Sequence, residues 1–91
     1  IRTTIVMPEY APLTKVNATR SLGAQVVLHG ASFDDAGAKA EELREAHGYT
    51  LVHAFNDHKV MAGQGTIGLE ILRDLPDVTM LVVPIGGGGL I

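Results

Sequence analysis

Short runs rich in β-branched residues alternate along this chain with stretches in which apolar residues recur at helical spacing. The β-branched runs predict four strands, at about residues 3–7, 25–29, 50–55 and 78–85. Three helices are expected between them, at about residues 12–22, 33–47 and 58–75. Each helix makes a connection long enough for its two flanking strands to run parallel. The alternation therefore predicts an α/β fold of the three-layer type, with a parallel sheet between layers of helices.

The predicted helices carry residues that commonly begin and end helices. Pro12 suits the first turn of the first helix, and Gly23 suits a left-handed stop after it. Ser32 can cap the second helix, and Asp35 three residues later can complete a capping box. Asp57 is expected to cap the third helix and to have no further role.

Four consecutive glycines, Gly86 to Gly89, follow the most apolar of the predicted strands. Glycine loses more backbone entropy on folding than any other residue, so a run of four needs a structural reason. Without Cβ atoms, successive backbone N–H groups can converge on one anion, and ligands of open α/β sheets gather beyond the carboxyl ends of the strands. The run therefore predicts a phosphate-binding loop, with a flexible linker as the alternative.

A second glycine pattern, from Gly63 to Gly68, matches the G-x-G-x-x-G signature of dinucleotide-binding sites. Its context differs from that of such a site, because the glycines lie inside a predicted helix and do not directly follow a strand. The next predicted strand also ends in Pro84-Ile85-Gly86, without the acidic residue that would bind a ribose. These glycines are therefore expected to let a helix approach its neighbours closely.

Composition narrows the class of protein. The chain has 91 residues, 46% of them hydrophobic, with a formal net charge of -3 and no cysteine. This size suits one small domain or a piece of a larger one. Without a basic patch, neither nucleic acid nor a membrane surface is an expected partner. The absence of a signal peptide or a membrane-spanning run favours a cytoplasmic location, and the absence of cysteine excludes disulfides and thiolate metal sites.

Two longer motifs resemble a known family. Ala62 to Leu72 reads AGQGTIGLEIL, and Val82 to Ile91 reads VVPIGGGGLI. Together they resemble the threonine/serine dehydratases, which are fold-type II pyridoxal-phosphate enzymes. The agreement extends to Val6–Gly30, VMPEYAPLTKVNATRSLGAQVVLHG, and so covers essentially the whole chain. A glycine run alone would be a weak signal, but its distance behind GQGT, after a strand containing proline, is specific.

The resemblance implies a cofactor site and a domain arrangement. In the family, the tetraglycine loop binds the phosphate of pyridoxal 5'-phosphate through backbone amides, which here belong to Gly86, Gly87, Gly88 and Gly89. Leu90 belongs to the same motif. Residues 1–55 would form the later part of the small mobile domain, and residues 56–91 would return the chain to the large domain. Because the chain begins within a predicted strand and ends in the glycine run, we expect an internal segment of a longer protein.

The implied reaction is the conversion of L-threonine to 2-oxobutanoate and ammonia, and of L-serine to pyruvate, by a homo-oligomeric parent enzyme. A serine racemase or a serine-preferring dehydratase of the same family is the alternative. A noncatalytic α/β module that binds phosphate is the competing interpretation from another class. The family's lysine that binds the cofactor covalently lies next to a serine and before an Arg-Gly pair, and nothing here matches it. This chain alone is therefore expected to be inactive.

The other ionisable residues are expected to have structural roles. Surface positions are predicted for three lysines: Lys15, Lys39 and Lys59. Four histidines, His29, His47, His53 and His58, lack the i, i+4 spacing of a helical metal site. His29 and His53 end predicted strands and are expected to be half-buried, and His47 suits a helix C-terminus. Solvated positions near the start or along the face of a helix are predicted for five acidic residues: Asp34, Asp35, Glu41, Glu42 and Glu45.

Overall fold

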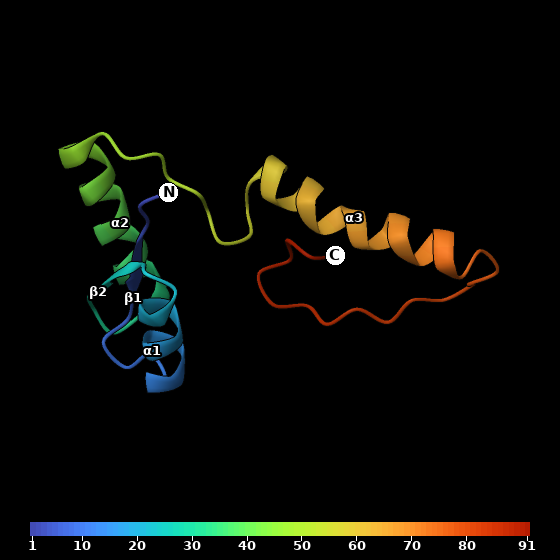
Figure 1. Ribbon diagram of the computed structural model, residues 1–91, viewed down its shortest axis with the longest axis horizontal. Coiled ribbons are helices and arrows are strands. Elements are labelled where there is room, and N and C mark those ends of the chain that lie inside the picture. Colours follow the sequence, from blue (N-terminus) through green and yellow to red (C-terminus); the bar gives the residue numbers. More distant parts are fainter. The chain divides into compact units, whose positions relative to one another are not determined.

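A computed structural model describes residues 1–91 (Figure 1). Its elements, in chain order, are β1 (Thr4–Met7), α1 (Leu13–Ser21), β2 (Gln25–Leu28), α2 (Phe33–His47) and α3 (His58–Asp74). They divide between two compact units, Ile1–Leu51 and Val52–Ile91, which are described separately. No helix of the chain combines the length and the apolar character needed to cross a bilayer.

The first unit, Ile1–Leu51, is built on a parallel pair of strands. β1 and β2 pair in register from Thr4 opposite Gln25 to Met7 opposite Leu28. The ladder extends at its far end, where the His29 N–H donates to the Met7 carbonyl at 2.9 Å. Because α1 provides the connection between two parallel neighbours, the predicted α/β class and parallel pairing are confirmed.

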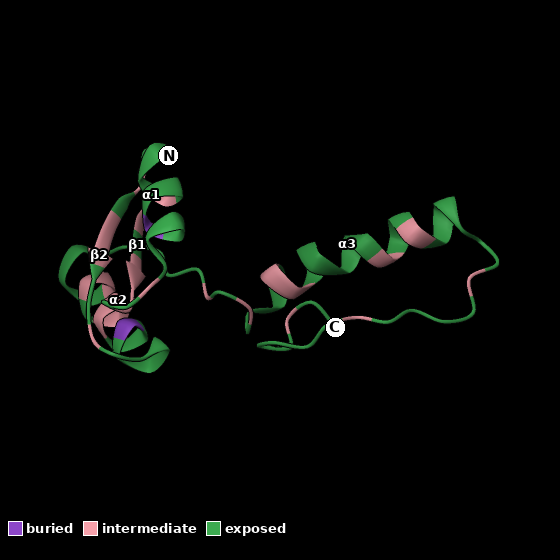
Figure 2. Ribbon diagram, turned by 90° about the horizontal axis from the view of Figure 1, so that it is seen from below, coloured by how far each residue is buried: buried purple, intermediate pink, exposed green.

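The core of this unit lies between the strands and their two helices. α1 packs against β2, and α2 packs against β1. Val16 of α1 is 3% exposed and Ala36 of α2 is 4% exposed, and they are the only buried apolar residues of the chain (Figure 2). The core is therefore small, and its stability depends on few side chains.

The predicted capping box at the start of α2 is present. The Asp35 backbone N–H donates to the Ser32 hydroxyl at 3.1 Å. In return, the Asp35 carboxylate accepts from the backbone N–H groups of Ala31 and Ser32, both at 3.0 Å. α2 ends at Gly48, whose φ of 67° is the left-handed conformation that glycine adopts without strain. Local sequence signals therefore set both ends of this helix.

The capping box makes the start of α2 sensitive to acid. Its hydrogen bonds, first from the Ser32 side chain and then from the Ala31 and Ser32 amides, lower the pKa of Asp35 below its ordinary value of 3.8. A carboxyl group with a lowered folded-state pKa stabilises the fold above its unfolded value, and that contribution is lost as pH falls through the folded value. We expect the amide proton resonances of Ala31 and Ser32 to move upfield in that acidic window when followed by NMR. An Asp35→Asn variant that shows the same pH-dependent shift would contradict this origin.

The second unit, Val52–Ile91, consists of α3 and the segments on either side of it. Asp57 caps α3, and its carboxylate accepts from the N–H groups of Lys59 at 2.8 Å and Val60 at 3.1 Å. After α3 the chain reverses and runs back along the helix, so that its last residues lie beside α3 in both views (Figures 1 and 2). The cap predicted from the sequence is confirmed.

The predicted strands at 50–55 and 78–85 are absent, and this part of the prediction was wrong. Both segments have the composition of strands, but a strand needs a neighbour that pairs with its backbone N–H and C=O groups. The chain's only sheet is the pair of β1 and β2 in the first unit. Nearly all of the two segments lies in the second unit, which contains no strand that could pair with them.

Candidate functional site

The glycine loop presents bare backbone. None of the amide N–H groups of Gly86 to Gly89 forms a hydrogen bond within the chain. Gly88 has a φ of 86°, a conformation that residues with a Cβ atom rarely adopt. The loop therefore contains four adjacent donors that have no acceptor in the chain, on a backbone path that requires glycine. This donor set suits a phosphate group, whose oxygens accept several hydrogen bonds.

Phe55 lies against one side of this loop. A Cβ atom added to Gly87 would come within 2.5 Å of Cδ1 and 2.6 Å of Cδ2 of the Phe55 ring. One added to Gly89 would lie 2.5 Å from the Phe55 carbonyl oxygen and 2.8 Å from its Cβ atom. Cβ positions built on Gly86 and Gly88 meet no atom within 4 Å. Alternate glycines, Gly87 and Gly89, thus allow close contact with Phe55, while a Cβ atom at Gly86 or Gly88 would meet open space.

His53 forms hydrogen bonds with the backbone at Phe55 and Asn56. Its Nδ1 atom accepts from the N–H groups of Phe55 at 3.2 Å and Asn56 at 2.8 Å. The imidazole also meets the Phe55 ring edge to face, with centroids 4.8 Å apart. Reasoning from the sequence missed both residues, because 50–55 was interpreted as a strand. The available signal was His53, a polar residue within the apolar run that ends just before the helix cap at Asp57.

Comparison with known proteins assigns the chain to a family. The family described as "Pyridoxal-phosphate dependent enzyme" matches residues 1–91. The chain belongs to this family. The L-threonine ammonia-lyase of Thermotoga maritima is 62% identical over the whole chain, which covers 23% of that relative. An L-threonine dehydratase of Staphylococcus aureus, catabolic TdcB, is 55% identical, with the chain covering 26% of its length.

Two solved structures are similar to the chain in fold and sequence. The processed form of threonine deaminase isoform 2 from Solanum lycopersicum matches 98% of the chain with a TM-score of 0.86 and 47% identity. Maize serine racemase matches 99% of it with a TM-score of 0.92 and 34% identity. The chain covers 24% and 27% of these two structures. It thus spans about a quarter of the length of the relatives it matches, and the predicted family is confirmed.

The second glycine motif does not form a site of its own in this family member. Gly63 to Gly68 lie within α3, as predicted, and not in a loop after a strand. A Cβ atom built on Gly63, Gly65 or Gly68 meets nothing within 4 Å, so the expected close approach to a neighbour is not present within this chain. The dinucleotide interpretation is therefore unsupported by the local geometry.

The three lysines lie on helices. None of them has the neighbouring residues expected around a cofactor-binding lysine. Lys15 and Lys59 are exposed on α1 and α3. Lys39 on α2 is only partly exposed, and its Nζ atom lies 2.6 Å from a carboxylate oxygen of Glu42. The same helix pairs Arg44 with Glu41 at 2.6 Å, which lowers the pKa of the Glu41 carboxyl. These pairs are i, i+3 contacts on a helix surface. Such ion pairs stabilise the helix, which explains them without a catalytic role.

The histidines are not grouped for metal binding. His29 is exposed and not half-buried as expected, whereas His53 is half-buried. His47 at the end of α2 stacks on Tyr49, with ring centroids 5.1 Å apart. No group of three or more histidine, aspartate or glutamate side chains in residues 1–91 is placed to hold a metal ion.

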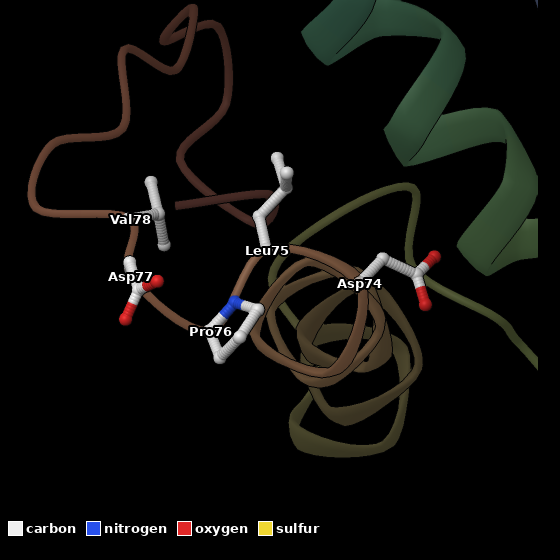
Figure 3. A pocket seen from close by; sticks show the side chains of 5 residues that line it. All are labelled: Asp74, Leu75, Pro76, Asp77 and Val78. Carbon is white, nitrogen blue, oxygen red and sulfur yellow. The ribbon is translucent and has the colours of Figure 1, made fainter.

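A shallow hollow lies where α3 ends, separate from the glycine loop. It has a volume of about 370 Å³ and is lined by Asp74, Leu75, Pro76, Asp77 and Val78 (Figure 3). In this view, the two carboxylates lie on either side of Pro76. Two carboxylates disfavour an anion, so this hollow is not a candidate for the phosphate.

Proposed function

We propose that this chain is the segment of a threonine ammonia-lyase (threonine dehydratase) that contains the phosphate-binding loop for pyridoxal 5'-phosphate. The observation that carries the proposal is the run of four glycine amides with no acceptor in the chain, including Gly88 at a φ of 86°. Two relatives, 62% and 57% identical to the chain, support the choice of reaction, because they are named L-threonine ammonia-lyase. A noncatalytic phosphate-binding module has no comparable support.

The chain's contribution is to hold and orient the cofactor. The amides of Gly86, Gly87, Gly88 and Gly89 would donate to the phosphate oxygens, and Leu90 would pack beside them. The bound cofactor supplies an electron sink for chemistry at the substrate's Cα atom. Fixing its phosphate fixes the position of the ring, which matters because misplaced reacting groups slow catalysis. Since no lysine here matches the family's cofactor-binding lysine, the chain alone would be inactive.

We further propose that the two compact units belong to different domains of the parent enzyme. The sequence placed the boundary after residue 55, with residues 1–55 in the small mobile domain and 56–91 in the large one. The structure divides between Leu51 and Val52, and Phe55 contacts the glycine loop. We therefore move the proposed boundary to this point and place the segment from Val52 with the large domain.

The proposed reaction converts L-threonine to 2-oxobutanoate and ammonia. The β-hydroxyl group and a Cα proton leave as water, and hydrolysis of the product then releases ammonia. L-Serine would give pyruvate in the same way. A homo-oligomeric enzyme in the cytoplasm, without nucleic-acid or membrane partners, remains a prediction from composition and resemblance. Serine racemase is the second candidate, favoured by the TM-score of 0.92 but at 34% identity against 62% for the ammonia-lyase.

Product analysis of the full-length enzyme separates these reactions. We expect 2-oxobutanoate and ammonia from L-threonine, and little D-serine from L-serine. Conversion of L-serine mainly to D-serine would favour the racemase.

Reconstitution of the apoenzyme with two cofactor forms tests the loop, because pyridoxal lacks the phosphate. Pyridoxal should bind at least about a hundredfold more weakly than pyridoxal 5'-phosphate, since it cannot form the several charge-assisted hydrogen bonds to the loop. Equal affinity for the two compounds would refute a phosphate site.

A further inference from the structure

We propose that Phe55 is a positioning residue for the cofactor's phosphate: its ring and backbone support Gly87 and Gly89 and thereby set the direction of the loop's amides. This inference rests on the proposed function of the glycine loop. It adds to the loop a residue about 30 positions upstream, which lies in the same compact unit.

The contacts show that the support is direct. The Phe55 ring occupies the space that a Cβ atom of Gly87 would fill, and the Phe55 carbonyl and Cβ atom occupy the corresponding space at Gly89. Glycine backbone can therefore rest on the aromatic ring and on the adjoining main chain. The Cβ positions of Gly86 and Gly88 meet no atom within 4 Å. Phe55 thus supports the loop at two of its four glycines.

Phe55 is itself held in place by His53. His53 accepts two backbone hydrogen bonds through Nδ1, from Phe55 at 3.2 Å and Asn56 at 2.8 Å, so this nitrogen carries the lone pair. The edge-to-face contact between the two rings restrains the Phe55 side chain. Asp57 then caps α3 immediately after this turn. The ring is therefore attached to the start of a 17-residue helix through a locally hydrogen-bonded turn.

A supported loop binds phosphate more tightly because less of its freedom must be lost on binding. Four adjacent glycines are the most flexible stretch a chain can have, and ordering them costs conformational entropy. A ring that limits their backbone to few conformations reduces that cost before the cofactor arrives. Loss of this support should therefore weaken binding of pyridoxal 5'-phosphate, which has the phosphate group. It should not weaken binding of pyridoxal, which lacks that group.

The first test compares two cofactor forms in the full-length apoenzyme. We expect Phe55→Ala to weaken binding of pyridoxal 5'-phosphate about tenfold and to leave binding of pyridoxal within about twofold, as for the loss of one ordering contact. Phe55→Leu, which keeps an apolar side chain, should lie between Phe55→Ala and the wild type. An equal loss of affinity for both cofactor forms would show a general structural effect and overturn the proposal.

His53 provides an independent measurement. Asparagine can place its side-chain oxygen near the position of Nδ1, so His53→Asn should retain more affinity for pyridoxal 5'-phosphate than His53→Ala. If both variants lose affinity equally, or if neither loses any, His53 does not hold Phe55 in the way proposed. The ratio of the affinities for the two cofactor forms is again the measured quantity.

Double variants test the contact itself. Gly87→Ala places a methyl group into the Phe55 ring, so adding Phe55→Ala should restore at least about fivefold of the lost cofactor affinity, as expected for directly contacting residues. Gly89→Ala places its methyl group against the Phe55 carbonyl and Cβ atom, which Phe55→Ala leaves in place. This pair should show no restoration and is the matched control. Equal restoration of cofactor affinity in the two pairs would contradict a direct contact between the Phe55 ring and Gly87.

The outcomes distinguish this inference from the proposed function. Gly88→Ala does not involve Phe55, because its Cβ atom meets nothing within 4 Å. If Gly88→Ala weakens binding of pyridoxal 5'-phosphate but Phe55→Ala does not, the loop is the phosphate site and Phe55 has no positioning role. If none of the glycine variants changes the affinity, the phosphate site itself is elsewhere.

Discussion

Replacing Gly88 by alanine is expected to weaken binding of pyridoxal 5'-phosphate by the enzyme about five- to thirtyfold, since a residue with a Cβ atom loses about 1–2 kcal/mol in the left-handed region. Gly88 has a φ of 86°. Alanine would favour a relaxed loop, and binding would have to drive the backbone back to the conformation that presents its amides. Titration of the apoenzyme with the cofactor measures this loss directly.

The control for this variant is Gly63→Ala in the middle of α3. Its Cβ atom also meets nothing within 4 Å, but Gly63 has an ordinary helical conformation. Alanine there should stabilise the helix by about 1 kcal/mol and leave cofactor affinity unchanged. If Gly88→Ala binds pyridoxal 5'-phosphate as tightly as Gly63→Ala does, the backbone of Gly88 is not part of the phosphate site.

The ends of α2 and the pairing of β1 with β2 could be predicted from the sequence, because they depend on residues that lie close together in the chain. The capping box of Ser32 and Asp35 depends on two residues three positions apart, and the stop at Gly48 depends on a single glycine. The pairing of β1 and β2 needs only one short connection, which α1 supplies. The requirement for bare backbone at the glycine loop could also be inferred, because glycine runs are costly without a use.

The predicted strands that are absent depend on partners that the sequence does not reveal. Residues 78–85 have the apolar and β-branched composition of a buried strand, but composition does not supply a neighbouring strand. The contact of Phe55 with Gly87 and Gly89 is equally non-local, because it joins residues about 30 positions apart. A glycine in the sequence shows that something needs space nearby, but only the structure shows that an aromatic ring takes it.

The largest effect on stability is expected from Val16→Asp in α1. Val16 is 3% exposed and lies in a core that contains only one other buried apolar residue. Burying a carboxylate without a partner should destabilise the first unit by at least about 3 kcal/mol. A unit of this size is stable by only about 5 kcal/mol, so most of its stability would be lost. Chemical denaturation followed by circular dichroism should show the helical signal of α1 and α2 disappearing at much lower denaturant concentration.

Leu13→Asp is the matched control because it makes the same chemical change on the same helix. Leu13 is 75% exposed and lies in the first turn, where a negative charge is favourable. Its midpoint of unfolding should stay close to that of the unchanged chain. Val16→Ala should fall between the two, with a loss of about 2 kcal/mol from the removed methyl groups. Equal midpoints for Val16→Asp and Leu13→Asp would show that the contact of α1 with β2 does not hold the first unit together.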